Sequence, residues 1–302
     1  MSSRVLAGHG SRYLIEHPVA GELIAAPRGR RRDIVVGDWV NAHVTGNNSA
    51  VIDSLEQRRN LMRRSDAMRS KALAANLDQA AYVIGAEPPY SEELLLRVQL
   101  AAAVEGISFF VIANKIDLQQ AYALMAPRLA LLRVLGVEVF ELAAKHDSDD
   151  ALSPLRQRLA GKSTLLLGQS GMGKSTLLNR LVPQANMRTR EISNALSSGK
   201  HTTSFTRLFR LEPAASGSVL IDSPGFQVFG LSHLSRAQTL YHVLEFGDHD
   251  QRCRFNDCSH RDEPGCAVRH NVESGQIDNQ RYRCYREIIN EVMTNSTIRR
   301  KG

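Results

Sequence analysis

The first 62 residues consist of short runs in which apolar and polar side chains alternate, with turn residues between them. The clearest runs lie at residues 12–15, 21–26, 33–40 and 49–53. Strands this short, recurring about every 10 residues, are typical of a small β-barrel or sandwich. We therefore predict a five-stranded barrel of the OB type over residues 1–64. The charged stretch 55–72 has little periodicity and is interpreted as the linker to a second domain.

After residue 72 the pattern changes to apolar runs that alternate with helical stretches. The apolar runs have the composition of buried strands and occupy residues 80–86, 107–113, 137–142 and 163–167. Helical stretches occupy residues 91–105, 118–135 and 151–160. Two later runs, 205–211 and 217–221, are predicted to pair as adjacent strands. Strands that alternate with helices indicate a parallel sheet covered on both faces, so we predict an α/β domain over residues 65–230.

The last part of the chain, residues 231–302, has no strand pattern. Helical patterning covers residues 235–246 and 279–294, which predicts a small α-helical domain. The chain is therefore expected to be a multidomain protein with a barrel, an α/β domain and a helical domain in that order.

A glycine-rich stretch follows the apolar run 163–167 and opens a helical pattern. Its pattern G-x-x-x-x-G-K-[ST] is that of a phosphate-binding loop, which requires this strand–turn–helix context. Glycines let successive backbone N–H groups point at one anion, the lysine contacts the β- and γ-phosphates, and the hydroxyl after it binds Mg²⁺. The predicted phosphate-binding residues are Gly168, Gln169, Ser170, Gly171, Met172, Gly173, Lys174, Ser175 and Thr176.

The sequence Asn114-Lys115-Ile116-Asp117 follows the apolar run 107–113 and predicts the base of the nucleotide. A carboxylate edge-on to guanine accepts from both N1–H and the exocyclic amine, a donor pair that adenine lacks, so Asp117 would select guanine. Asn114 can bond the base and brace neighbouring loops, and the stem of Lys115 can cover the ring.

The segment after the run 137–142 supplies further base contacts. Ala143, Ala144 and Lys145 stand where many GTPases have Ser-Ala-Lys. Backbone contacts from Ala144 and Lys145 to the guanine O6 survive the replacement of that serine by Ala143, so both residues are included in the predicted site.

The sequence Asp222-Ser-Pro-Gly225 comes at the end of the run 217–221 and matches D-x-x-G. Asp222 would hold Mg²⁺ through water, and the Gly225 N–H would meet the γ-phosphate. The alternative is an ordinary turn, for which D-x-P-G is also suitable. The other Mg²⁺ ligands would be Ser175 and a threonine of the segment 199–203, where Thr202 and Thr203 both qualify and the sequence does not choose between them.

Hydrolysis needs a group that orients water. Ras-like enzymes carry a Gln after D-x-x-G, but this chain has Phe226, which cannot orient water. His201 is the predicted substitute, with a solvent-exposed histidine as the alternative. Lys174, His201 and Asp222 form the predicted catalytic set, and hydrolysis is expected to be slow until a partner accelerates it.

The motifs occur in an unusual order. In common GTPases the phosphate loop comes first and N-K-x-D follows, whereas here residues 114–117 precede residues 168–176. The cyclic order is preserved, which indicates a circular permutation of the domain.

All four cysteines lie between residues 253 and 284. Cys253, Cys258, His260 and Cys266 offer three thiols and one imidazole, the donor set of a closed tetrahedral Zn²⁺ site of structural type. Such clustering favours metal binding over disulfides in a chain without a signal peptide. Cys284 falls on a helical stretch and is interpreted as a packed thiol, with its replacement of His260 as the alternative.

The composition adds charge to this picture. The net charge is +7, and residues 1–64 contain ten Arg against six Asp and Glu. This excess suits a polyanionic partner, and a basic loop with Arg28, Arg30, Arg31 and Arg32 between two strands is a candidate RNA contact on a hairpin. A solvated loop is the equal alternative. No apolar run is long enough to span a membrane, and the expected location is the cytoplasm.

These motifs together resemble the circularly permuted ribosome small subunit-dependent GTPase A family, called RsgA or YjeQ. The resemblance rests on N-K-I-D, G-Q-S-G-M-G-K-S-T, G-K-H-T-T, D-S-P-G-F and C-x4-C-x-H-x5-C, and on Arg281-Tyr-x-x-Tyr285. It implies an OB barrel, a permuted GTPase domain and a zinc domain. It also implies GTP hydrolysis stimulated by the 30S ribosomal subunit during late maturation of that subunit, through contact with 16S rRNA.

Three functions remain in competition at this point. The first is an rRNA-bound GTPase that acts, as a monomer, in assembly of the subunit. The second is an RNA-binding module in which the nucleotide is only structural, against which the intact Lys174, Ser175 and Asp222 argue. The third is a permuted GTPase that acts on another RNA or on a membrane.

Overall fold

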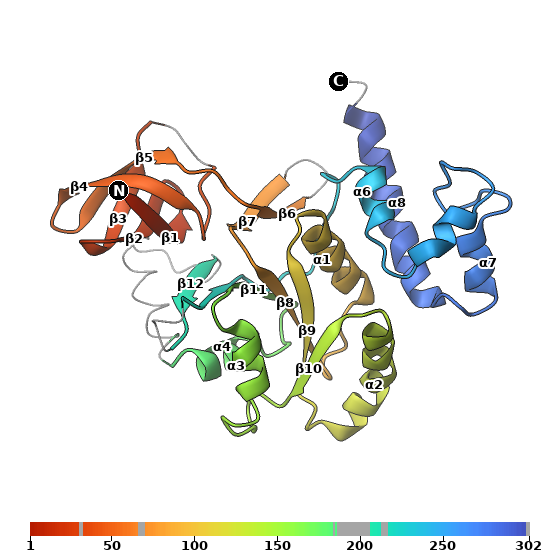
Figure 1. Ribbon diagram of the computed structural model, residues 1–302. Coiled ribbons are helices and arrows are strands. Elements are labelled where there is room, and N and C mark those ends of the chain that lie inside the picture. The colour runs from red at the N-terminus through yellow and green to blue at the C-terminus, as the bar shows by residue number, and fades with distance from the viewer. Residues whose placement is uncertain (30–32, 66–69, 184, 186–205, 213–216, 300–302) are drawn as a thin grey trace.

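The computed structural model describes residues 1–29, 33–65, 70–183, 185, 206–212 and 217–299. Figure 1 shows a barrel at the N-terminus, a central sheet flanked by helices, and a helical part that contains the C-terminus. This arrangement confirms the predicted fold class. No helix among the described residues is long and apolar enough to cross a membrane.

Five strands close the N-terminal barrel: β1 (Ser2–His9), β2 (Arg12–His17), β3 (Gly21–Pro27), β4 (Trp39–Gly46) and β5 (Ser49–Leu55). They pair in the order β1-β2-β3-β5-β4, and β4 returns to pair with β1. Alternate side chains of each strand point inward, so Val5, Ile15, Leu23, Val40 and Ile52 form one compact apolar core.

Two details of the barrel differ from the prediction. The run 33–40 does not form one strand, because Gly37 adopts a φ of 89° and the Asp38 carboxylate accepts the N–H of Val35 to form a turn. The basic loop after β3 is also not a hairpin, since β3 pairs in parallel with β5 and does not pair with β4.

The prediction that residues 55–72 form a linker was wrong. The second half of this stretch forms the antiparallel hairpin β6 (Leu61–Ser65) and β7 (Ser70–Ala75). Leu61 and Met62 are buried while Arg63 and Lys71 are exposed, so the arginines and lysines that hide the periodicity line the outer side of a packed hairpin.

Six strands form the central sheet in the order β10-β9-β8-β11-β13-β12. Their bounds are β8 (Gln79–Gly85), β9 (Ser108–Asn114), β10 (Glu138–Leu142), β11 (Ser163–Gly168), β12 (Arg207–Arg210) and β13 (Val219–Asp222). All pairs are parallel except β12 with β13. On its other side β12 pairs with β1 of the barrel, so one sheet of 11 strands runs through both parts.

Helices cover both faces of this sheet, as the alternation predicts. Apolar side chains of α1 (Glu92–Val104) and α2 (Gln119–Val134) belong to the core on one face. Those of α3 (Ser153–Leu159) and α4 (Lys174–Leu181) belong to the core on the other face. Ser91 caps α1 by accepting the N–H of Leu94, as predicted.

The C-terminal part contains α6 (Arg236–Tyr241), the short 3-10 helix η2 (Gly247–Arg252), α7 (Ala267–Glu273) and α8 (Asn279–Arg299). The first helix is shorter than the predicted 235–246, although Ser235 and Gln238 form a capping box at its start. Helix α8 packs on α1, which joins this part to the central sheet (Figure 1).

Candidate nucleotide site and metal centre

The phosphate loop lies between β11 and α4, and its two outer glycines are fixed by their surroundings. A Cβ on Gly168 would lie 2.4 Å from the carbonyl oxygen of Val83. A Cβ on Gly173, which has a φ of 89°, would lie 2.1 Å from Nδ2 of Asn114. Only glycine fits at either position, so the tight course of the loop depends on both residues.

Lys174 opens α4 and is buried against the loop. Its Nζ donates to the carbonyls of Gly168 at 2.8 Å and Gln169 at 2.9 Å. Burial lowers the pKa of this ammonium, and the nearby Asp222 acts in the opposite direction. Ser175 and Thr176 follow at the exposed start of the helix, where hydroxyl groups can reach a metal ion and a phosphate.

Asn114 joins three loops at the carboxyl ends of the strands. Its Nδ2 donates to the carbonyl of Met172 at 3.0 Å, and its Oδ1 accepts the N–H of Ala144 at 3.0 Å. The side chain therefore braces the phosphate loop against the segment 143–145, which brings the predicted base contacts and phosphate contacts to one edge of the sheet.

The other predicted base contacts lie beside Asn114. Nζ of Lys115 donates to the carbonyl of Glu87 at 2.6 Å, and this lysine has a left-handed φ of 63°. Ile116 is half-buried, while Asp117 and Lys145 are exposed. Oδ2 of Asp117 lies 3.8 Å from Nε2 of the exposed His146.

Asp222 ends β13 at the same edge of the sheet. Burial raises its pKa to about 6, against the lowering effects of Lys174 and Arg207. The turn that follows is fixed by Ser223, whose Oγ donates to the carbonyl of Leu166 at 3.0 Å. A Cβ on Gly225 would lie 3.2 Å from Nζ of Lys174, so this turn and the lysine face one position.

Phe226 turns away from this position. It is buried, and its ring packs against Phe229 at 5.1 Å and Tyr82 at 6.4 Å between centroids. The residue that replaces the water-orienting glutamine is therefore part of the core.

Several predicted residues lie outside the described part of the chain: Arg30, Arg31, Arg32, His201, Thr202 and Thr203. Arg28 is described and is exposed, with its Nη1 3.9 Å from Oδ1 of Asp53.

The structure brings Cys253, Cys258, His260 and Cys266 together, with all four donor atoms within 4.8 Å of one another. Sγ of Cys253 lies 3.9 Å from Sγ of Cys266 and 3.4 Å from Nδ1 of His260. Donors about 2.3 Å from a tetrahedral zinc ion lie roughly 3.8 Å apart. Three of the four residues are buried, and their donor atoms have separations that suit zinc, so the Cys3His cluster fits this metal. Cys284 is not part of the cluster.

The loop that carries the cluster is held from outside. Tyr282 on α8 donates its hydroxyl to the carbonyl of His260 at 2.7 Å, and Tyr285 donates to the carbonyl of Ser259. The Glu263 carboxylate accepts the N–H groups of Ser259 at 2.8 Å and Arg261 at 3.0 Å. These contacts orient the metal-binding side chains in the way that outer-layer partners do in metal sites.

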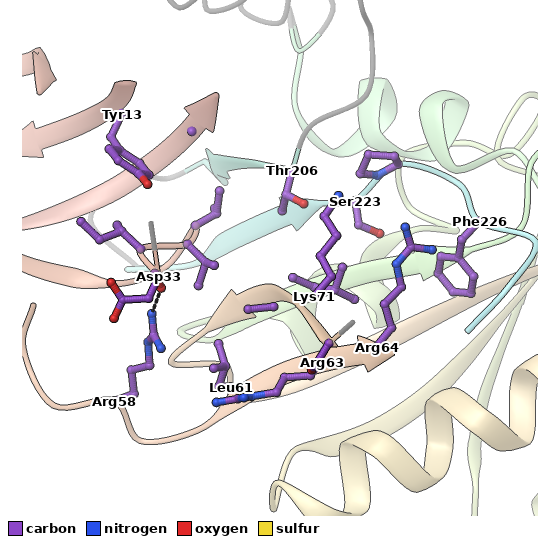
Figure 2. A pocket seen from close by; sticks show the side chains of 18 of the residues that line it. Tyr13, Asp33, Arg58, Leu61, Arg63, Arg64, Lys71, Thr206, Ser223 and Phe226 are labelled. Carbon is purple, nitrogen blue, oxygen red and sulfur yellow. Dashed lines mark hydrogen bonds between the residues drawn. The ribbon is translucent and has the colours of Figure 1, made fainter. Parts of the chain in front are cut away.

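A groove of about 880 Å³ separates the barrel from the central sheet. Figure 2 shows that Arg64 and Lys71 reach from the β6–β7 hairpin toward Ser223 and Phe226, so one wall of the groove is the turn after Asp222. Arg64 donates to the carbonyl of Val228 at 3.0 Å. Among the described residues, neither Arg63 nor Lys71 pairs with a carboxylate, and both are exposed.

Some contacts and residues of the site were not predicted from the sequence. Among the predicted residues, Oε1 of Gln169 accepts the N–H of Ser91 at 2.7 Å, and Sδ of Met172 accepts the N–H of Gly85 at 3.0 Å, and neither Ser91 nor Gly85 was assigned to the site. Arg207 lies beside Asp222 in the β12–β13 pair. The sequence shows only an arginine within the run 205–211, and the burial of Arg207 and its place opposite Asp222 come from the fold.

The parallel sheet carries a phosphate loop, N-K-x-D and D-x-x-G at one edge, and the N-K-x-D strand β9 precedes the phosphate strand β11 in the chain. This is the architecture of a circularly permuted P-loop GTPase. The chain belongs to the RsgA GTPase family, whose family model matches residues 55–232. Members of this family hydrolyse GTP.

Similar proteins extend over nearly the whole chain. "Small ribosomal subunit biogenesis GTPase RsgA" of Burkholderia pseudomallei (strain K96243) is 46% identical over 95% of this chain and 91% of its own length. The protein of the same name from Ralstonia pickettii (strain 12J) is 45% identical with the same coverage. The crystal structure of YjeQ from Thermotoga maritima has a TM-score of 0.72 and 26% identity, and the match covers 97% of this chain and 98% of that one.

Proposed function

We propose that this GTPase binds the small (30S) ribosomal subunit and assists its late maturation. In this proposal it hydrolyses GTP to GDP and phosphate, and contact with the subunit stimulates hydrolysis. Relatives that are 45–46% identical over most of the chain carry the name of small ribosomal subunit biogenesis GTPases, which supports the proposal.

The observation that carries the proposal is the position of the basic groove. Arg63, Arg64 and Lys71 line it, and the turn from Ser223 to Phe226 forms part of its wall. The phosphate backbone of RNA binds such basic surfaces. We infer that 16S rRNA is the polyanion that binds in this groove. Binding there would act directly on the turn that is predicted to contact the γ-phosphate.

The ligands follow from the same residues. GTP and GDP would be held at the base by Asn114 and Asp117 and at the phosphates by residues 168–176. Mg²⁺ would bind the hydroxyl of Ser175 and, through water, Asp222, and it would neutralise charge on the β- and γ-phosphates. His201 is proposed to orient the attacking water. One structural Zn²⁺ would be held by the Cys3His cluster.

We expect the protein to act in the cytoplasm, where ribosomal subunits are assembled, and to do so as a monomer. Sedimentation of the GTP-bound protein, alone and with purified small subunits, tests the monomer and the complex together.

The experiment that tests the function measures turnover of GTP and ATP with and without purified small subunits. We expect GTP hydrolysis to be slow alone and to rise strongly with subunits, and ATP to be a poor substrate. Equal use of ATP would contradict the role of Asp117, and the absence of stimulation would contradict the ribosomal partner. The variant His201→Ala should lose the stimulated rate and keep GTP binding. Unchanged stimulated turnover would remove His201 from the mechanism.

A further inference from the structure

Strand β12 connects the barrel to the nucleotide site. It is four residues long, and all four pair with β13, so that Arg207 lies opposite Asp222. On its other side Arg207 lies opposite Ala7 of β1. The barrel strand β1 is therefore the neighbour of β12, and only β12 and β13 lie between it and the phosphate loop strand β11 (Figure 1).

One ion pair fastens this junction at its far end. Arg210, the last residue of β12, donates from Nε to Oε1 of Glu16 at 2.9 Å and from Nη2 to the other carboxylate oxygen. Such bidentate pairs fix orientation as well as distance. Glu16 lies in β2, directly opposite Arg4 of β1, and the charges of both Glu16 and Arg210 act on the Arg4 guanidinium.

We propose that Glu16 and Arg210 are positioning residues for the GTPase reaction. By clamping β12 to the barrel they hold β13 in register, and with it Asp222 and the turn to Gly225. This proposal depends on the GTPase activity of the family. It does not depend on binding to the ribosomal subunit.

The short length of β12 explains why loss of the Glu16–Arg210 pair affects the binding of GTP more than the binding of GDP. A strand of four residues has few hydrogen bonds of its own, so its position depends on what pairs with its edges. Loosening β12 displaces the start of the Asp222–Gly225 turn, whose predicted contacts are Mg²⁺ and the γ-phosphate. GDP lacks the γ-phosphate and keeps its contacts with Asn114, Asp117 and the phosphate loop.

The test is a charge swap. The variants Glu16→Arg, Arg210→Glu and the double variant are compared with the unmodified protein for binding of a non-hydrolysable GTP analogue and of GDP in the presence of Mg²⁺. Each single variant should lower the affinity for the analogue about fivefold to tenfold, because a partly exposed pair is lost and repulsion is added. The affinity for GDP should change less than twofold. Glu16→Arg should be the more harmful variant, because it places three guanidinium groups together.

The double variant should restore the affinity for the analogue to within about twofold, since it rebuilds the pair in reverse. Arg133→Glu is the matched control, because Arg133 forms a pair with Glu141 of similar exposure at the opposite edge of the sheet. If a single variant fails to fold, Glu16→Gln and Arg210→Gln remove the pair without repulsion and carry the test. Equal loss of GTP and GDP binding, no loss at all, or failure of the swap to restore binding would overturn the proposal.

Discussion

The central sheet has two junctions, one with the barrel and one with the C-terminal part, and they are built differently. At the C-terminal junction the side chains of Arg281 and Glu92 are 1% and 7% exposed. At the barrel junction those of Arg210 and Glu16 are 37% and 30% exposed. If a buried ion pair separates, an unpaired charge remains shielded from water, which costs several kcal/mol of free energy. A hydrated pair can separate at little cost, because water solvates both charges. The C-terminal part is therefore fixed to α1 through buried charges, whereas the side-chain pair at the barrel junction is hydrated.

The contacts of α8 support this view. Arg281 pairs with Glu245 and donates to Oε1 of Gln99 at 2.9 Å. Arg128 on α2 joins Asp278 through two hydrogen bonds of 2.9 and 3.0 Å and also reaches Glu92. Helices from both parts therefore share one network of buried and half-buried charges.

The largest effect should come from removal of the metal. Binding of structural zinc contributes roughly 10 kcal/mol or more to folding of a small metal-binding unit. Treatment with a chelator, or the variant Cys258→Ser, should unfold the loop 253–266 and expose it to protease, as measured by limited proteolysis and zinc content. Affinity for GDP should persist, because the nucleotide site does not include the cluster. If removal of the metal also abolished GDP binding, the nucleotide site would depend on the metal site. The distinction between the two junctions would then fail.

The second effect is that of Arg281→Met. This change leaves the buried Glu245 without its cation, while Glu92 keeps its pair with Arg128. Loss of one partner of such a buried pair costs about 3–5 kcal/mol in the free energy of unfolding. Denaturant unfolding should show a large loss of stability. Arg286→Met is the control, because Arg286 is 38% exposed and pairs with an exposed Asp262. Equal losses in the two variants would show that burial does not distinguish the C-terminal junction.

A smaller effect concerns Asp222, which lies next to the barrel junction. Because its pKa is raised to about 6, the folded protein binds a proton there more tightly than the unfolded chain. The free energy of unfolding therefore falls as pH rises from about 4 to 6, by roughly 3 kcal/mol for this group. Asp222→Asn should stabilise the nucleotide-free protein by that amount at pH 7.5 and have no effect at pH 4.

Thermal unfolding at the two pH values measures this difference. The same variant should bind GTP more weakly in the presence of Mg²⁺, since the carboxylate is the predicted partner of the ion. Equal gains at both pH values would show that the buried charge is not the cause.

The smallest effect should come from Arg4→Gln. Arg4 donates from Nη2 to Oγ of Ser163 at 2.8 Å across the barrel junction. Loss of one such hydrogen bond costs about 1 kcal/mol or less. Thermal unfolding should shift by a few degrees at most, and a loss as large as that of Arg281→Met would remove the contrast between the junctions.

Much of this molecule was predictable because its signals are local. Residues 168–176 and 114–117 reveal phosphate and guanine chemistry through fixed spacing, and their order reveals the permutation. The β6–β7 hairpin was missed because Arg63, Arg64 and Lys71 stand among its apolar residues and conceal the buried Leu61 and Met62.

The contacts between parts could not be predicted for a different reason. Glu16 and Arg210 are separated by 194 residues, and Arg281 and Gln99 by 182. No periodicity or motif records which charged residues meet across such distances. The sequence predicts the separate elements, but which of their edges pair depends on the tertiary fold.

The permuted order of the strands has a consequence for synthesis of the chain. Strand β8 lies between β9, which follows it closely, and β11, which leaves the ribosome about 80 residues later, as the pairing of Gln79 with Thr164 shows. Chains fold from the N-terminus as they emerge, so β8, β9 and β10 can assemble with the guanine-binding loop while the phosphate loop does not yet exist. We expect the nascent protein to gain affinity for nucleotide only when β11 has inserted beside β8. Nucleotide binding would then mark the insertion of β11 beside β8, before β12 and β13 have joined the sheet.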